Sequence, residues 1–167
     1  MEQIKKLLKE NRIKEVYLVG FVDEVNGVFE FCPDLRFLYF EFAEGIVECR
    51  SVEQCSRLQL KIVDSIRHDF EIDEDMFAAT SRAGELILDN PELLTNEIAR
   101  LTAYGLKQAD GEMNCLALEM QLKSGQFIFI DPTFLHGISV GSHNQKKLWK
   151  ENLLDRLAVE ASECSVF

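Results

Sequence analysis

Two dipeptides, Asn26-Gly27 and Asp110-Gly111, each stand between runs in which apolar and polar residues alternate. A type I′ turn needs positive φ at both central residues, so Asn-Gly and Asp-Gly in this setting are the strongest short-range signal of a β-hairpin. In both regions a further strand pattern with a glycine turn follows, at Glu44-Gly45 and Ser124-Gly125. The segments 15–50 and 97–131 therefore share one plan, which indicates either an internal duplication or chance similarity between two hairpin-rich stretches.

Alternation is cleanest in the second segment. Leu116, Leu118, Met120 and Leu122 share one parity, while Glu119, Gln121 and Lys123 share the other. This pattern predicts an antiparallel sheet with one buried and one wet face, turning at Ser124-Gly125. Residues 127–130 are apolar at every position, which predicts a central strand covered on both sides.

Helices are expected near both ends of the chain. Residues 2–11 place Ile4, Leu7 and Leu8 on one side and lysines opposite. Ser142 and Gln145 have the spacing of a capping box, followed by an apolar stripe of Leu148, Trp149, Leu153, Leu157 and Ala158. A short strand is expected at 84–88. The predicted fold class is α+β, dominated by antiparallel sheet, with a short N-terminal helix and a C-terminal amphipathic helix.

Aromatic residues are concentrated in the first segment. Leu38, Phe40 and Phe42 share one parity and should face the core, so Phe37 and Tyr39 should face the opposite side. That side is either covered by the C-terminal helix, through Leu148, Trp149 and Leu153, or exposed as a binding surface.

Length and charge narrow the possible classes of protein. The 167 residues fit a single domain over 1–167, and the formal charge of −11 disfavours binding to nucleic acid or to an anionic membrane. A basic protein partner, a cation or solubility alone remain as reasons for this acidity. The N-terminus resembles no signal peptide, and five irregularly spaced cysteines are typical of free thiols in a reducing cytosol, so a cytoplasmic location is expected.

The sharpest charge feature is an acidic run over residues 69–75. If the run is extended, most of its acids lie on one face and Phe70 and Ile72 lie on the other. Its carboxylates, the candidate partner-binding residues, are Asp69, Glu71, Asp73, Glu74 and Asp75. We weigh three interpretations: an ordinary solvated surface, a surface for a basic partner, and a loosely held divalent cation.

An EF-hand loop is not one of these interpretations. A calcium loop that begins at Asp69 requires glycine at position 74 and glutamate at position 80, where the chain has Glu74 and Thr80. The cysteines also lack zinc-ligand spacing, and no nucleotide-binding glycine motif occurs, so neither a dedicated metal site nor a cofactor is expected, and any cation at the acidic run would bind only loosely.

No catalytic constellation is expected either. Gly137-Ile138-Ser139-Val140-Gly141 matches G-x-S-x-G, but only His143 follows it, too close to serve as the base of a hydrolase triad. Asp131 and His136 follow the most apolar strand, where acid–base groups often lie, yet no third group accompanies them.

Two functional hypotheses follow. The leading one is a non-catalytic, small acidic interaction protein, in its specific form an immunity or inhibitor protein that masks a basic partner. The alternative is a small-ligand-binding or enzymatic β-rich domain, whose pocket lies between the sheet and the C-terminal helix with Asp131 and His136 at its mouth.

Overall fold

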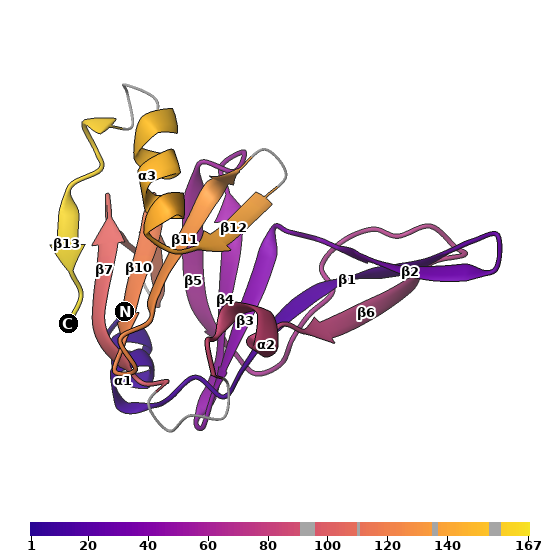
Figure 1. The fold of residues 1–167 in the computed structure, drawn as a ribbon, viewed down its shortest axis with the longest axis horizontal. Helices are drawn as coiled ribbons and strands as arrows, with labels where there is room; N and C mark the ends of the chain where they lie inside the picture. The colour runs from indigo at the N-terminus through magenta and orange to yellow at the C-terminus, as the bar shows by residue number, and fades with distance from the viewer. Residues whose placement is uncertain (91–95, 110, 135–136, 154–157) are drawn as a thin grey trace.

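The computed structural model describes residues 1–90, 96–109, 111–134, 137–153 and 158–167. It confirms the predicted fold class: two mainly antiparallel sheets, with a helix near each end of the chain (Figure 1). The first sheet holds β1 (Glu15–Val25), β2 (Val28–Pro33), β3 (Phe37–Phe42), β4 (Gly45–Val52), β5 (Arg57–Val63), β6 (Phe77–Arg82), β8 (Lys107–Ala109) and β9 (Glu112–Cys115). The second holds β7 (Ile98–Tyr104), β10 (Ala117–Leu122), β11 (Phe127–Phe134), β12 (Gly137–Gly141) and β13 (Glu163–Ser165).

The strands of the first sheet follow the order β2-β1-β3-β4-β5-β9-β8, with β6 paired to β1, and those of the second follow β12-β11-β10-β7-β13. One large apolar core draws residues from both sheets, including Leu58 and Leu60 of β5 and Leu118 and Met120 of β10. Helix α1 (Glu2–Glu10) adds Ile4, Leu7 and Leu8 to this core, as the sequence predicts.

The hairpin turns confirm the turn chemistry read from the sequence. Asn26 and Gly27 have φ values of 56° and 79°, and Val25 pairs with Val28 across them. Gly111 also has positive φ, at 77°, whereas Asp110 lies outside the described residues. Leu118, Met120 and Leu122 are buried in the shared core, as the predicted register of β10 requires, whereas Leu116 precedes β10 and is buried in a separate cluster around Trp149.

The two segments also share a pattern of strand pairing. β1 pairs with β3 through its first residues and with β2 through its last, while β7 pairs with β10, and β8, which follows it, pairs with β9. Farther along the chain and outside the two segments, β6 pairs with β1 and β13 pairs with β7. A true duplication of 15–50 and 97–131 stays a prediction.

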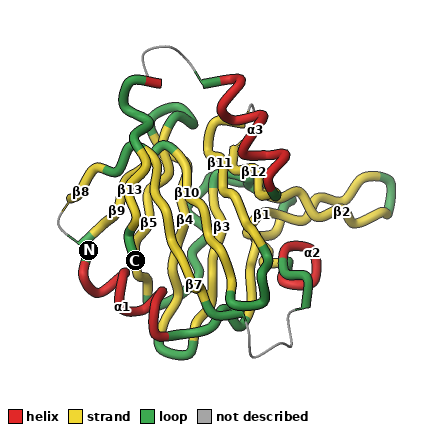
Figure 2. The backbone as a smooth tube through the Cα atoms, turned by 60° about the vertical axis from the view of Figure 1, so that its left-hand side comes forward, coloured by secondary structure: helices red, strands yellow, loops and turns green. Residues whose placement is uncertain are grey.

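Helix α3 (His143–Asn152) covers the outer face of the second sheet. Its Trp149 is buried against Tyr104 and Phe129, with ring centroids 5.1 and 5.4 Å away. Ile128 and Ile130 face the inner core, so the strand over 127–130 is covered on both sides, as predicted. Figure 2 shows α3 at the end of the sheets opposite α1.

The predicted capping box does not form. Ser142 is the N-cap residue of α3, but its side chain makes no capping hydrogen bond. The Gln145 amide instead donates to Asp131 Oδ2 at 2.8 Å. Asp131 is only 4% exposed, and a buried carboxylate needs donors more than a solvent-exposed helix end needs a cap.

Two further expectations are wrong. Residues 84–87 form the short helix α2 (Gly84–Ile87) rather than a strand, because the Glu15 carboxylate accepts a 2.8 Å hydrogen bond from the Gly84 amide. Phe37 and Tyr39 are indeed covered, but not by the C-terminal helix. They pack with Val19 and Val63 beneath partly buried residues of the β5–β6 connection, Ile66 and Phe70.

The register makes a direct stability prediction. Leu118 is 1% exposed in the shared core, so Leu118→Ala should lower the free energy of unfolding by about 2–5 kcal/mol. Leu148→Ala is the matched control, since Leu148 is 50% exposed and should change stability by less than about 0.5 kcal/mol. Urea unfolding measures both, and equal losses would contradict the assigned register.

Candidate functional site

One part of the first sheet extends beyond the second sheet. Residues 20–33 of the β1–β2 hairpin and residues 77–82 of β6 project from the body as three strands, which we call the arm (Figures 1 and 2). The second sheet does not reach it, so the described part of the chain places no second sheet over the arm.

The arm exposes large apolar side chains. Val25 and Val28 at its turn are 49% and 56% exposed, and Phe29 and Phe77 are each 66% exposed. Val22 lies opposite Phe31 on one side and Phe77 on the other, and Phe29 lies two residues from Phe31. Because opposite and alternate residues share a face, these four side chains form one apolar face, Val22, Phe29, Phe31 and Phe77.

The arm also places like charges together. Asp23 lies directly opposite Glu30 in the register of β1 and β2, whereas Glu24 lies opposite Phe29 and therefore on the apolar face. Two carboxylates directly opposite one another destabilise a strand pair. This arrangement weakens the free arm, and a nearby positive charge would relieve it.

The β5–β6 connection, residues 64–76, follows the arm and adds to its charge (Figure 1). We call it the acidic segment. Phe70 and Ile72 are half-buried, whereas the five acids of the predicted site are exposed, as expected from their alternation. His68 Nε2 lies 3.1 Å from Thr80 Oγ1, which ties the acidic segment to β6.

Together, residues 20–33 and 64–82 hold nine of the protein's 29 acidic residues but only two of its 18 basic ones. Among the described residues, only one of these nine carboxylates forms an ion pair: Asp69 with Arg50, at 3.6 Å. The arm and the acidic segment therefore carry a formal charge of −7 out of −11 for the whole chain, with little internal compensation.

Glu15 fixes the root of the arm. Its Oε1 accepts hydrogen bonds from the amides of Val16 at 2.9 Å and Gly84 at 2.8 Å, and its Oε2 accepts one from Arg82 at 2.6 Å. The carboxylate thereby links β1, the end of β6 and the start of α2. Burial raises the pKa of Glu15, but the hydrogen bonds and the Arg82 charge outweigh it and leave the pKa lowered.

An apolar cavity of about 170 Å³ lies at the inner side of this root. Its walls come from β1, the β2–β3 connection, β3, α2 and β12, through Leu18, Leu35, Phe37, Leu38, Ile87, Ile138 and Val140. Leu18 lies four residues before Val22 on β1, so both have the same parity and the cavity continues the apolar face of the arm.

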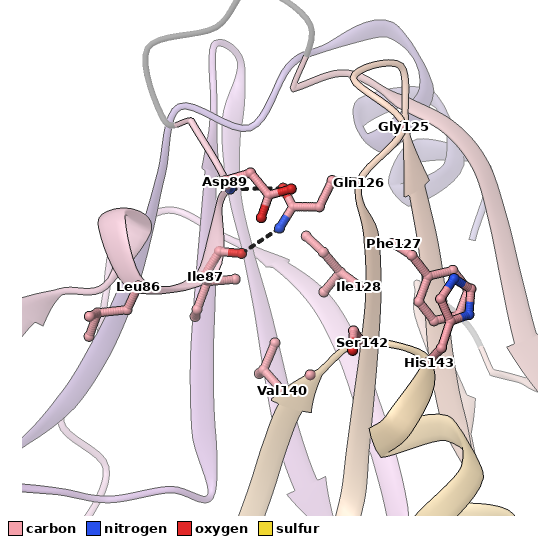
Figure 3. A pocket seen from close by; sticks show the side chains of 11 residues that line it. Leu86, Ile87, Asp89, Gly125, Gln126, Phe127, Ile128, Val140, Ser142 and His143 are labelled. Atoms are coloured by element: carbon pink, nitrogen blue, oxygen red, sulfur yellow. Dashed lines mark hydrogen bonds between the residues drawn. The ribbon is translucent and has the colours of Figure 1, made fainter.

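A larger cavity, of about 420 Å³, lies between α2, the start of β11 and the end of β12 (Figure 3). The Gln126 amide bridges its wall, donating to the Ile87 carbonyl oxygen at 2.7 Å and accepting from the Asp89 amide at 3.1 Å. Phe127 stacks on His143 with ring centroids 3.8 Å apart. The volume lies within the range of small-molecule sites.

Asp131, which the sequence places at the mouth of the alternative pocket, does not line this cavity. Asp131 is buried on β11 and bonded to Gln145, and His136 lies outside the described residues. The space between the second sheet and α3 is filled by Tyr104, Phe129 and Trp149. Ser139 of the G-x-S-x-G sequence lies within β12, opposite Asp131, and not on a strand-to-helix turn.

Within the described ranges, no three His, Cys, Asp or Glu side chains gather as a metal site requires. No helix in this part of the chain has the length and apolar character to cross a membrane. Comparison with protein-family models, curated proteins and solved structures found no match to this chain.

Glu15 generates a pH prediction. Its folded-state pKa lies below the usual 4.5, so its stabilisation is fully present above pH 4.5 and is lost as the pH falls through the lowered pKa. Glu15→Gln should therefore have a lower free energy of unfolding than wild type at pH 7. This gap in free energy between the two proteins should shrink as the pH falls below 4.5. Urea unfolding across this range measures the gap; a gap that does not change with pH would contradict the role of Glu15.

Proposed function

We propose that this protein is a non-catalytic interaction module that binds a basic protein partner through the arm and the acidic segment. In the specific form that we favour, it is an immunity- or inhibitor-type protein that masks a basic surface of its partner. The contacts would involve Asp69, Glu71, Asp73, Glu74 and Asp75 of the acidic segment, with Asp23, Glu24 and Glu30 of the arm.

The observation that supports this proposal most is the uncompensated charge of the projection. Eight of its nine carboxylates form no ion pair within the described part of the chain, although 18 basic residues are available in the sequence. Asp23 and Glu30 oppose one another directly. Like charges repel in the free protein, so a basic surface that approaches them relieves the repulsion as it binds.

The charge also predicts how the partner binds. Exposed carboxylates on a projecting element steer a basic partner towards it, which raises the association rate more than it slows dissociation. The Debye length is about 8 Å at physiological ionic strength, so added salt should weaken this steering.

A second candidate, a small-ligand-binding or enzymatic domain, draws support from the cavity of Figure 3. Its volume of about 420 Å³ and its polar lining residues Asp89, Ser142 and His143 suit a small molecule. The cavity lies apart from Asp131, however, and the Gln126 amide is already occupied.

Charge reversal tests the leading proposal. The variant Glu71→Lys, Asp73→Lys, Asp75→Lys changes three exposed acids that form no ion pair among the described residues. The control Glu10→Lys, Glu44→Lys, Glu151→Lys shifts the net charge equally at exposed positions outside the arm and the acidic segment. Partners are captured from the source organism, identified and purified, and their association rates are measured at low and high salt.

We expect the wild type and the control to bind a basic protein with an association rate that falls about tenfold or more with added salt. The acidic-segment variant should lose this partner while remaining folded and at least as stable. Equal capture by both variants would contradict the proposal and assign the segment to ordinary solvated surface.

A further inference from the structure

We infer that the partner reaches the apolar face of the arm, and that it is therefore a cationic protein segment carrying large apolar side chains. This inference rests on the proposed function and specifies the chemistry of its interface. The apolar face consists of Val22, Phe29, Phe31 and Phe77, as defined above.

The first argument is exposure without a structural role. Phe29 and Phe77 are each 66% exposed on β2 and β6, the two strands that flank β1, and no second sheet of the described residues covers this projection. Scattered apolar residues at a surface are ordinary, but aromatic residues gathered on one face mark interaction sites. Such residues, ringed by polar groups, form the energetic centre of many protein interfaces.

The second argument is continuity with the apolar cavity at the root of the arm. The cavity of about 170 Å³ is lined by Leu, Ile, Val and Phe side chains. One of them, Leu18, lies on β1 on the same face as Val22 of the arm. Apolar cavities of about 150 Å³ accept a molecule the size of benzene. A partner segment that lies along the apolar face can therefore place one apolar side chain in the cavity.

The third argument is charge complementarity, which selects among possible occupants. The arm and the acidic segment together carry a formal charge of −7. A second copy of this chain would bring the same charge against itself, and an anionic membrane would be repelled. A cationic segment with apolar side chains can contact the aromatic side chains and Glu24, which lies opposite Phe29 on the same face, while Asp23 and Glu30 lie on the other face of the hairpin.

Two synthetic peptides serve as probes. One is rich in lysine and carries phenylalanines; the other has the same charge, with serine in place of each phenylalanine. Their affinities are measured for wild type, for Phe29→Ser, Phe77→Ser, and for the control Leu148→Ser, Val159→Ser. The control removes two apolar side chains that are also exposed, at 50% and 88%, but lie outside the arm.

We expect wild type and the control to bind the phenylalanine peptide about tenfold more tightly than the serine peptide, as the loss of an aromatic anchor predicts. Phe29→Ser, Phe77→Ser should abolish this preference but still bind both peptides weakly, with an unchanged melting temperature. In wild type, changes in amide NMR shifts on adding the phenylalanine peptide should map to residues 21–31 and 77–79.

The other outcomes separate the inference from the proposed function. If wild type binds both peptides equally, and the charge-reversal variant binds neither, the acidic surface stands and the apolar inference is overturned. If wild type binds neither peptide, both are overturned. Sedimentation of wild type as a dimer that Phe29→Ser, Phe77→Ser dissociates would assign the face to a second copy and overturn the inference.

Discussion

The two sheets share one apolar core, but the first sheet extends beyond the second. The rest of the structure depends on this difference. Each sheet contributes one apolar face, and burial of those faces is the main force that holds the layers together. β1 is 11 residues long and serves both inside and outside this core. Val16 is fully buried in the core, whereas Val25 at the other end is 49% exposed. The arm is thus the part of the first sheet that the second sheet does not cover.

The root of the arm shows how the fold supports such a projection. Glu15 is nearly buried, so its carboxylate must find donors, and it takes them from Val16, Arg82 and Gly84. Phe70 of the acidic segment packs with the cluster around Val19 and Tyr39, which anchors one end of a charged connection. A root held by these hydrogen bonds and a projection that carries both carboxylates and exposed apolar side chains suit an element that contacts another molecule.

Much of the fold could be predicted from local pattern. The parity of Leu118, Met120 and Leu122 determines which face of β10 is buried in the shared core, because a slip of one residue would bury Glu119 and Gln121. Asn26-Gly27 determines its hairpin by turn chemistry alone. Interactions between distant residues could not be predicted in this way. α2 depends on Glu15, 69 residues earlier in the chain, and Gln145 turns to Asp131 instead of capping α3.

The candidate site was predicted only in part. The acids of residues 69–75 are visible as a charge run, and their exposure follows from alternation with Phe70 and Ile72. The apolar face was missed because Phe77 is far from Phe29 in sequence and joins it only through the pairing of β6 with β1. The sequence does contain one signal for it: valines flank Asn26-Gly27, and apolar residues are unusual at the tip of a solvated hairpin.

Hydrogen exchange of the protein with and without its captured partner tests the central claim most directly. If the arm and the acidic segment form the interface, the partner should slow amide exchange within residues 21–31 and 69–79. Exchange in β7 and β10, which lie in the shared core, should be unchanged. Protection around the cavity of Figure 3, with none on the arm, would contradict this account and favour the ligand-binding alternative.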